Sequence, residues 1–133
     1  MQKMKGTGKS DRTLKSSADT ERRIEAIMKS LKLRDNFYWT GIVDKDLRVF
    51  DIIMYTEFGT TYNSYVMKAG DKTILFETAK EKFFDDYLEK LEEITEVTKI
   101  DYLVVNHTEP DHAGSVERLL ELNPGLKIIA TGC

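Results

Sequence analysis

The sequence predicts a mixed α/β domain, with a β-rich first part and a strand–helix–strand unit at its end. Three observations support this prediction. Residues 37–77 are rich in β-branched and aromatic residues and are interrupted by short polar or glycine-containing turns. Phe84, Tyr87 and Leu91 then follow at helical spacing. Residues 101–130 read as strand, loop, helix and strand, which is the pattern of a βαβ unit.

The composition is that of one soluble globular domain. The 133 residues are 41% apolar and 32% charged, with a formal charge of −3, which gives no reason to expect nucleic acid or an anionic membrane as a partner. No stretch approaches the roughly 18 apolar residues of a membrane span, and the N-terminus lacks the apolar core of a signal peptide. The single cysteine, Cys133, cannot form an internal disulfide. We therefore expect a cytoplasmic protein.

The chain is expected to begin with a leader and a helix. Residues 1–18 are polar and without periodicity, which predicts a flexible leader. The next apolar residues fall at i, i+3, i+4 and i+7 and predict an amphipathic helix: Ile24, Ile27, Met28 and Leu31.

Four β stretches follow the predicted first helix. They are residues 37–42, 47–55, 62–68 and 73–77, and the sequence Ala-Gly-Asp at 69–71 predicts the hairpin turn before the last of them.

The remaining elements are helix, strand, helix and strand. Thr78 and Glu81 match a capping box, which predicts the start of the second helix. Residues 101–106 contain four apolar residues without alternation, as in a strand covered on both faces. A short helix on Val116, Leu119 and Leu120, ended by Asn123-Pro124-Gly125, and a strand at 127–130 complete the list of expected elements.

Both histidines of the chain lie directly after the strand 101–106, in the pattern H-x-E-x-D-H formed by His107, Glu109, Asp111 and His112. Imidazole and carboxylate are ligands that suit iron, manganese and zinc, and ligands gather at the carboxyl ends of strands in α/β sheets. In an extended loop His107, Glu109 and Asp111 would point to one side, with His112 directed to a neighbouring position. This arrangement favours two adjacent metal ions. The alternative is a solvated turn whose acids are stabilised by a helix dipole.

This pattern resembles the metallo-β-lactamase superfamily, whose usual first motif is H-x-H-x-D-H. With Glu109 in place of the second histidine, the motif resembles that of the flavodiiron proteins. The segments 39–50, 59–68 and 75–80 are similar, in the same order, to the N-terminal stretch of that family. The resemblance covers residues 35–132. It implies an αββα sandwich, of which residues 19–133 would be the N-terminal half, with the family's flavodoxin-like FMN domain absent.

The resemblance also implies a function. Flavodiiron proteins reduce dioxygen to water, or nitric oxide to nitrous oxide, at a non-haem di-iron centre, with electrons that arrive through FMN from a donor such as a rubredoxin. Carried over by position, His107 and Glu109 would bind one iron, and Asp111 and His112 the other. A carboxylate in place of an imidazole also makes the site harder and more negative, which favours iron over zinc.

The chain departs from the family pattern at two points. It has no third histidine, whereas the family completes its site with two further histidines and a bridging aspartate. We therefore expect an incomplete di-iron centre, with exposed strand edges that favour a homo-oligomer. Glu77 stands where the superfamily more often has aspartate, and would either accept a hydrogen bond behind the metal ligands or be a surface acid. A zinc-type metallohydrolase and a truncated, non-catalytic module remain as alternative functions.

Overall fold

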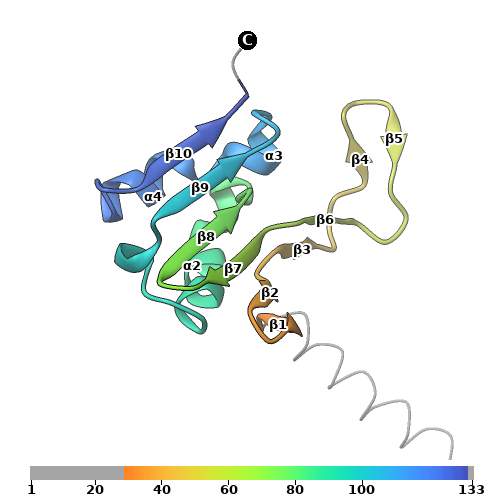
Figure 1. The fold of residues 1–133 in the computed structure, drawn as a ribbon. Coiled ribbons are helices and arrows are strands. Elements are labelled where there is room, and N and C mark those ends of the chain that lie inside the picture. The colour runs from red at the N-terminus through yellow and green to blue at the C-terminus, as the bar shows by residue number, and fades with distance from the viewer. Residues whose placement is uncertain (1–28, 132–133) are drawn as a thin grey trace, which may run out of the picture.

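A six-stranded mixed sheet forms the centre of the molecule in the computed structural model, which describes residues 29–131 (Figure 1). The strand order is β1-β2-β7-β8-β9-β10. Neighbours from β1 to β8 are antiparallel, whereas β8, β9 and β10 are parallel. The bounds are β1 (Leu31–Arg34), β2 (Phe37–Trp39), β7 (Tyr65–Ala69), β8 (Lys72–Phe76), β9 (Tyr102–Val105) and β10 (Lys127–Ala130).

Helices pack on one face of this sheet. Figure 1 shows α2 behind β7 and β8, and α4 behind β9 and β10. The bounds are α2 (Phe84–Glu92), α3 (Pro110–Ala113) and α4 (Val116–Leu122), with single 3₁₀ turns η1 (Glu81–Phe83) and η2 (Val97–Lys99). The core lies between the two layers, where central strands and helices contribute fully buried side chains: Val66, Leu75, Leu103, Tyr87, Leu91 and Leu119.

Two smaller sheets lie outside the central sheet. β3 (Ile42–Asp44) pairs with β6 (Thr60–Tyr62), and β4 (Val49–Phe50) pairs with β5 (Met54–Tyr55). The β4–β5 hairpin projects away from the central sheet (Figure 1), and residues 45–59 are called the arm below. Its turn is exposed and apolar, because Ile52 and Ile53 are 92% and 84% exposed.

The mixed α/β class is confirmed, and so is the βαβ unit at the end of the chain. β9 and β10 are parallel neighbours joined through α4, whose last residue, Leu122, directly precedes the predicted stop at Asn123. The β7–β8 hairpin turns at Gly70, whose φ of 62° is readily adopted only by glycine. The predicted helix stripe is also confirmed, since Phe84, Tyr87 and Leu91 are buried in α2.

The prediction for the N-terminal helix is wrong at its last residue. Leu31 lies in β1, where it pairs with Trp39, because the backbone of this segment adds to the edge of the central sheet. Ile24, Ile27 and Met28 lie outside the described residues, as does the expected leader, 1–18.

The predicted capping box is also wrong. Helix α2 begins at Phe84, and no side chain caps either α2 or the preceding turn η1. The Thr78 hydroxyl instead donates a hydrogen bond of 2.7 Å to the backbone oxygen of His112. The local pattern predicts that this hydroxyl caps the helix. In the structure it instead forms a hydrogen bond with a residue distant in sequence.

Coverage of β9 is less complete than its apolar run predicts. Leu103 and Val105 are buried on one face, whereas Tyr102 and Val104 on the other face are only half-buried. In β10, Ile128 and Ile129 are 43% and 50% exposed. In residues 29–131, the helices cover one face of this part of the sheet, so the prediction of a strand buried on both faces is wrong for this structure.

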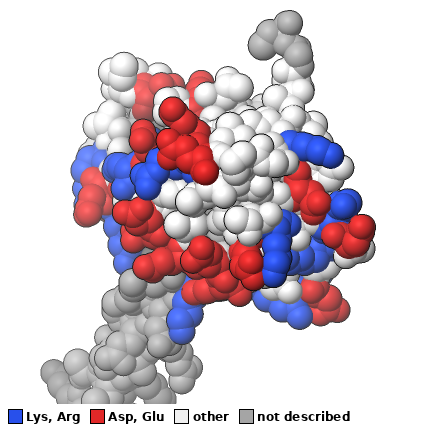
Figure 2. Space-filling view, turned by 90° about the vertical axis from the view of Figure 1, so that its left-hand side faces the viewer, with Lys and Arg blue, Asp and Glu red and all other residues white. Residues whose placement is uncertain are grey.

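The surface carries charges of both signs. On the face that Figure 2 shows, basic and acidic side chains of the described residues are interspersed, and acidic groups gather in its lower part. None of the helices in residues 29–131 combines the length and the apolar character needed to cross a membrane.

Candidate metal centre

The segment that carries the H-x-E-x-D-H pattern connects β9 to α4, and residues 106–115 are called the ligand loop below. It leaves the carboxyl end of β9, as predicted, and makes one helical turn, α3, before α4 begins. Pro110 is the first residue of α3, a position that suits proline because its missing N–H is not needed there.

The turn α3 corrects the expectation of an extended loop. Asp111 and His112 lie in α3, whereas His107 and Glu109 precede it, so the side chains do not alternate as they would in a strand. The His112 ring does not face away from the others, because its centroid is 5.2 Å from that of His107. His107 Nδ1 lies 3.9 Å from Glu109 Oε2, and His112 Nε2 lies 3.3 Å from Asp111 Oδ2.

The four side chains differ in their exposure. Those of His107 and Glu109 are 55% and 65% exposed, whereas those of His112 and Asp111 are 31% and 10% exposed. The loop therefore has a solvent-facing pair and a more buried pair.

Backbone contacts fix the buried end of the ligand loop. Thr78 donates two hydrogen bonds to the backbone oxygen of His112, from its N–H and its hydroxyl, both of 2.7 Å. The Ser115 hydroxyl donates to the backbone oxygen of Ala79 at 2.8 Å. Gly114 packs against Pro110 and Glu81 so closely that a Cβ atom would overlap the Pro110 oxygen. The segment after β8 and the ligand loop therefore form one packed unit.

Glu77 lies at the point where β8 meets this loop. Glu77 as a whole residue is only 9% exposed, so the alternative that it is a surface acid is wrong. Its Oε1 accepts a hydrogen bond of 2.7 Å from the backbone N–H of Asn106, the residue before His107. Its backbone has a φ of 57°, which costs about 1–2 kcal/mol for a residue with a Cβ atom. The structure thus keeps an acid directly behind the ligand loop in spite of backbone strain.

Two buried side-chain atoms of residues 29–131 lack a hydrogen-bond partner, and both belong to this region. They are Glu77 Oε2 and His112 Nδ1. Unpaired buried polar atoms are uncommon and destabilising, and in native structures they often mark a missing ion or water, or a functional group. Both atoms lie beside the ligand loop, so the incompletely paired polar groups of the described residues gather in this region.

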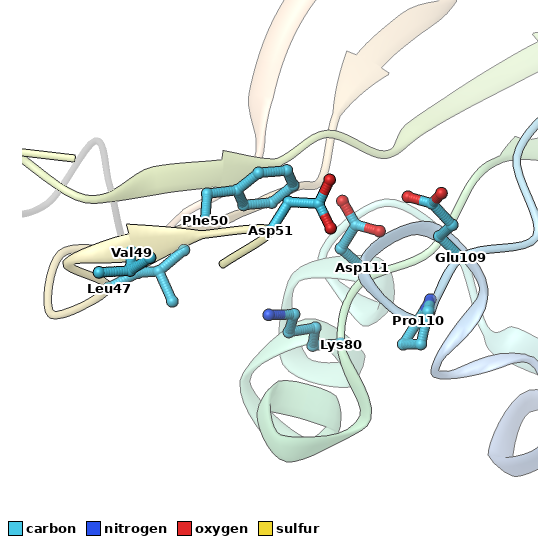
Figure 3. Close-up of a pocket in the computed structure, with 8 residues that line it drawn as sticks. All are labelled: Leu47, Val49, Phe50, Asp51, Lys80, Glu109, Pro110 and Asp111. Carbon is cyan, nitrogen blue, oxygen red and sulfur yellow. The ribbon is translucent and has the colours of Figure 1, made fainter. Parts of the chain in front are cut away.

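A pocket of about 270 Å³ opens between the ligand loop and the arm (Figure 3). Glu109 and Asp111 line one side, and the apolar side chains of Leu47, Val49 and Phe50 line the other. Asp51 and Lys80 complete the lining, and Figure 3 shows the carboxylates of Asp51, Asp111 and Glu109 directed into the same space. Sequence reasoning did not identify Asp51, Lys80 or Phe50, because no local pattern joins them to the motif.

A buried polar cluster supports the base of the arm. Asp44 Oδ2 accepts hydrogen bonds from Tyr62 at 2.8 Å and from Lys82 at 2.9 Å. Burial opposes ionisation of Asp44, but these bonds and the Lys82 charge outweigh it and hold the pKa of the Asp44 carboxyl below its ordinary value. Burial, the bond to Asp44 and the negative charges of Asp44 and Asp111 raise the pKa of Tyr62.

The donor set fits iron in its chemistry, since two imidazoles and two carboxylates lie in one loop with orphaned buried atoms beside them. In residues 29–131, however, no group of three or more His, Cys, Asp or Glu side chains is already arranged to hold a metal ion. The four residues form two close pairs and not a closed cage. To bind a metal ion, the two pairs would therefore have to move closer to each other, or further ligands would have to come from outside this segment.

Comparison with known proteins gives one matching family model and several similar curated proteins. Residues 60–132 match a family model described as "ODP family beta lactamase". The chain is 46% identical over 104 residues to the flavo-diiron protein FprA2 of Clostridium acetobutylicum, covering 78% of this chain and 26% of that protein. It is 43% identical over 100 residues to a nitric oxide reductase of Moorella thermoacetica, covering 74% of this chain and 25% of that protein.

A solved structure gives the same result for the fold. Rubredoxin oxygen:oxidoreductase from Desulfovibrio gigas superposes with a TM-score of 0.70 at 27% identity, over 79% of this chain and 32% of that chain. The chain spans about a quarter of the length of the two curated relatives. It therefore corresponds to part of a metallo-β-lactamase-like domain in longer proteins.

Proposed function

The chain belongs to the flavodiiron protein family, and we propose that it supplies ligands of a non-haem iron centre in an oxidoreductase. The observation that carries this proposal is the H-x-E-x-D-H pattern at the carboxyl end of β9, with all four donor side chains in one loop. Membership of the flavodiiron protein family also supports iron as the metal and redox chemistry as the activity. The resemblance inferred from the motif is confirmed, whereas the role of each residue is proposed here.

We assign the four side chains to two iron ions. His107 and Glu109, whose side chains are 3.9 Å apart, would hold one iron at the solvent-facing side. Asp111 and His112, 3.3 Å apart and more buried, would hold the other. The iron would supply reversible changes of valence, which are needed to pass electrons to a small oxidant. Glu109 contributes a hard anionic ligand in place of an imidazole, which favours iron over zinc.

Other residues would shape the space in front of this centre. Leu47, Val49 and Phe50 form an apolar wall opposite Glu109 and Asp111, which limits the entry of water into the pocket. Lys80 places a cation at the same pocket and so offsets part of the negative charge of Asp51, Glu109 and Asp111. A small uncharged oxidant fits the pocket volume of about 270 Å³.

The substrate and partners are proposed from the names of relatives. One is named a nitric oxide reductase and another a rubredoxin oxygen:oxidoreductase. We infer that a protein containing this segment reduces dioxygen to water, nitric oxide to nitrous oxide, or both, with FMN and a rubredoxin-like donor supplying electrons. A homo-oligomer belongs to the same proposal. Because the chain covers about a quarter of its curated relatives, this activity is proposed for the whole protein.

Metal preference tests the proposal in the chain itself. The chain is incubated anaerobically with equal concentrations of ferrous iron and zinc, desalted, and its metals are measured by elemental analysis. We expect Glu109→His to raise the zinc-to-iron ratio about tenfold, because a softer imidazole replaces a carboxylate. Glu117→Gln, an exposed acid of α4, is the matched control and should leave the ratio unchanged.

Two results would overturn the proposal. One is a wild-type zinc-to-iron ratio equal to that of Glu109→His. The other is zinc-dependent hydrolysis of an ester or thioester by the wild-type chain, which would favour the metallohydrolase. We expect the chain alone to bind fewer than two irons, because the remaining ligands would lie outside it. Two tightly bound irons with oxidase turnover would contradict this expectation.

A further inference from the structure

Asp51 lies in the turn of the arm, yet its carboxylate faces the ligand loop across the pocket. Figure 3 shows it directed into the same space as the carboxylates of Glu109 and Asp111. Asp51 and Ile52 both have left-handed backbones, with φ of 51° and 69°, which is uncommon for residues with a Cβ atom. The turn of the arm therefore presents an acid to the side of the pocket that carries the proposed ligands.

The lining of this pocket has an excess of negative charge. Its acids are Asp51, Glu109 and Asp111, and its base is Lys80. The Lys80 ammonium also contacts Tyr62, 5.1 Å from the centroid of the ring, and one ammonium cannot balance three carboxylates. Like charges repel, and they repel more strongly where apolar side chains reduce the water between them. In a chain without a bound cation, the acid of the arm is therefore repelled by the acids of the ligand loop.

The arm is anchored at its base and exposed at its tip. Asp44, directly before the arm, is buried, and Gly59 at the other end lies so close to it that a Cβ atom would overlap the Asp44 backbone oxygen. Within the arm, the Thr56 N–H donates a hydrogen bond of 2.9 Å to the backbone oxygen of Arg48. A hairpin that is fixed at one end and exposed at the other can change its distance from the ligand loop without disturbing the core.

We propose that Asp51 is a positioning residue that holds the arm against the ligand loop when this loop carries a divalent cation. A divalent cation bound by one carboxylate leaves a net positive charge, which attracts the Asp51 carboxylate where the acids alone repel it. The apolar wall of the arm then covers the space in front of Glu109 and Asp111 and limits the entry of water. The cation itself rests on the function proposed above, whereas the role of Asp51 goes beyond that function.

Two substitutions of Asp51 separate its charge from its shape. Asparagine adopts the left-handed backbone as readily as aspartate does, so Asp51→Asn keeps the turn and removes the charge. Asp51→Lys reverses the charge, so the side chain is attracted by the acids of the metal-free ligand loop and repelled once the loop carries a cation. Asp46→Asn removes an exposed acid of the arm that does not line the pocket, and it is the matched control.

Hydrogen–deuterium exchange of residues 45–59, measured by mass spectrometry on the full chain, follows the arm directly. Exchange is compared under anaerobic conditions without metal and with saturating ferrous iron, and elemental analysis gives the iron bound in each sample. We expect iron to slow the exchange of the arm about 5-fold in the wild type and in Asp46→Asn, but less than about 2-fold in Asp51→Asn. In Asp51→Lys iron should instead speed the exchange.

The outcomes separate this inference from the proposed function. If the wild type binds iron and the exchange of residues 45–59 does not change, the inference is overturned and the proposed function stands. Equal slowing in Asp51→Asn and the wild type, or slowing in Asp51→Lys, would also overturn it, because the charge at this position would not control the arm. A wild-type chain that binds no iron would overturn both, since Asp51 would then have no cation to attract it.

Discussion

The ligand loop and the arm face each other across one pocket, yet they are held in different ways. The ligand loop is fixed by buried hydrogen bonds from Thr78, Ser115 and Glu77. The arm consists of two-residue strands with an exposed apolar turn. Rigidity therefore lies on the side that carries the proposed ligands. The side that supplies the apolar wall has few buried contacts, and it is expected to open at a lower free energy.

Truncating one aliphatic side chain in the strand that supports the ligand loop and one in the arm should give the largest difference. Leu103 is fully buried in β9, the strand that leads into the ligand loop, so Leu103→Ala should lower the free energy of unfolding by about 2–5 kcal/mol. Ile53→Ala in the arm should change it by less than about 0.5 kcal/mol, because that side chain is 84% exposed. Urea unfolding followed by circular dichroism measures both. Equal losses would show that the arm is packed in solution.

Gly114 tests the close packing of the ligand loop. Gly114→Ala would place a Cβ atom on the Pro110 oxygen and 2.9 Å from the Glu81 nitrogen, and we expect a loss of about 1–3 kcal/mol. Gly125→Ala is the control, since its Cβ would lie at an ordinary 3.5 Å from Asn123 Oδ1. Urea unfolding measures the free energy of unfolding of both variants. If Gly114→Ala leaves it unchanged, the ligand loop and η1 are farther apart in solution than in this structure.

The elements that could be predicted from the sequence are those whose structure depends on neighbouring residues. β9, α4 and β10 follow from local periodicity and from Asn123-Pro124-Gly125, and they are confirmed. The location of the motif at a strand end follows from the order of these elements. Such features need no knowledge of distant partners.

Distant partners explain the failures. The Thr78 hydroxyl binds a backbone oxygen 34 residues away, so its local capping pattern was misleading. The burial of Glu77 depends on Asn106, and Asp51 reaches the pocket only because the arm lies opposite the ligand loop. Leu31 became a strand residue through pairing with Trp39. In each case a tertiary contact, absent from any local pattern, decides the outcome.

The base of the arm should respond to acid. The pKa of Asp44 is lowered in the folded state from its ordinary value, since the effect of burial is outweighed by the bonds from Lys82 and Tyr62. This contribution to stability is present above the unfolded-state pKa and is lost as the pH falls through the folded-state pKa. Asp44→Asn should lose about 1–2 kcal/mol at neutral pH and show a weaker acid dependence.

Unfolding measured from pH 7 to pH 3 tests this dependence. Asp46→Asn, an exposed acid at the same end of the arm, is the control and should keep the wild-type profile. An Asp44→Asn variant whose stability falls as steeply in acid as that of the wild type would contradict the assignment.

The tip of the arm should give the smallest change, and one of opposite sign. Ile52 has a φ of 69° and is 92% exposed, so its side chain contributes strain and little packing. Ile52→Gly should raise the free energy of unfolding by up to about 1 kcal/mol, because removing the strain outweighs the added freedom of the unfolded chain. Ile53→Gly, at a position without a positive φ, should lower it by about 0.5–1 kcal/mol. If both substitutions destabilise the protein, the left-handed turn is not the conformation of the arm in solution, and the wall it provides to the pocket lies elsewhere.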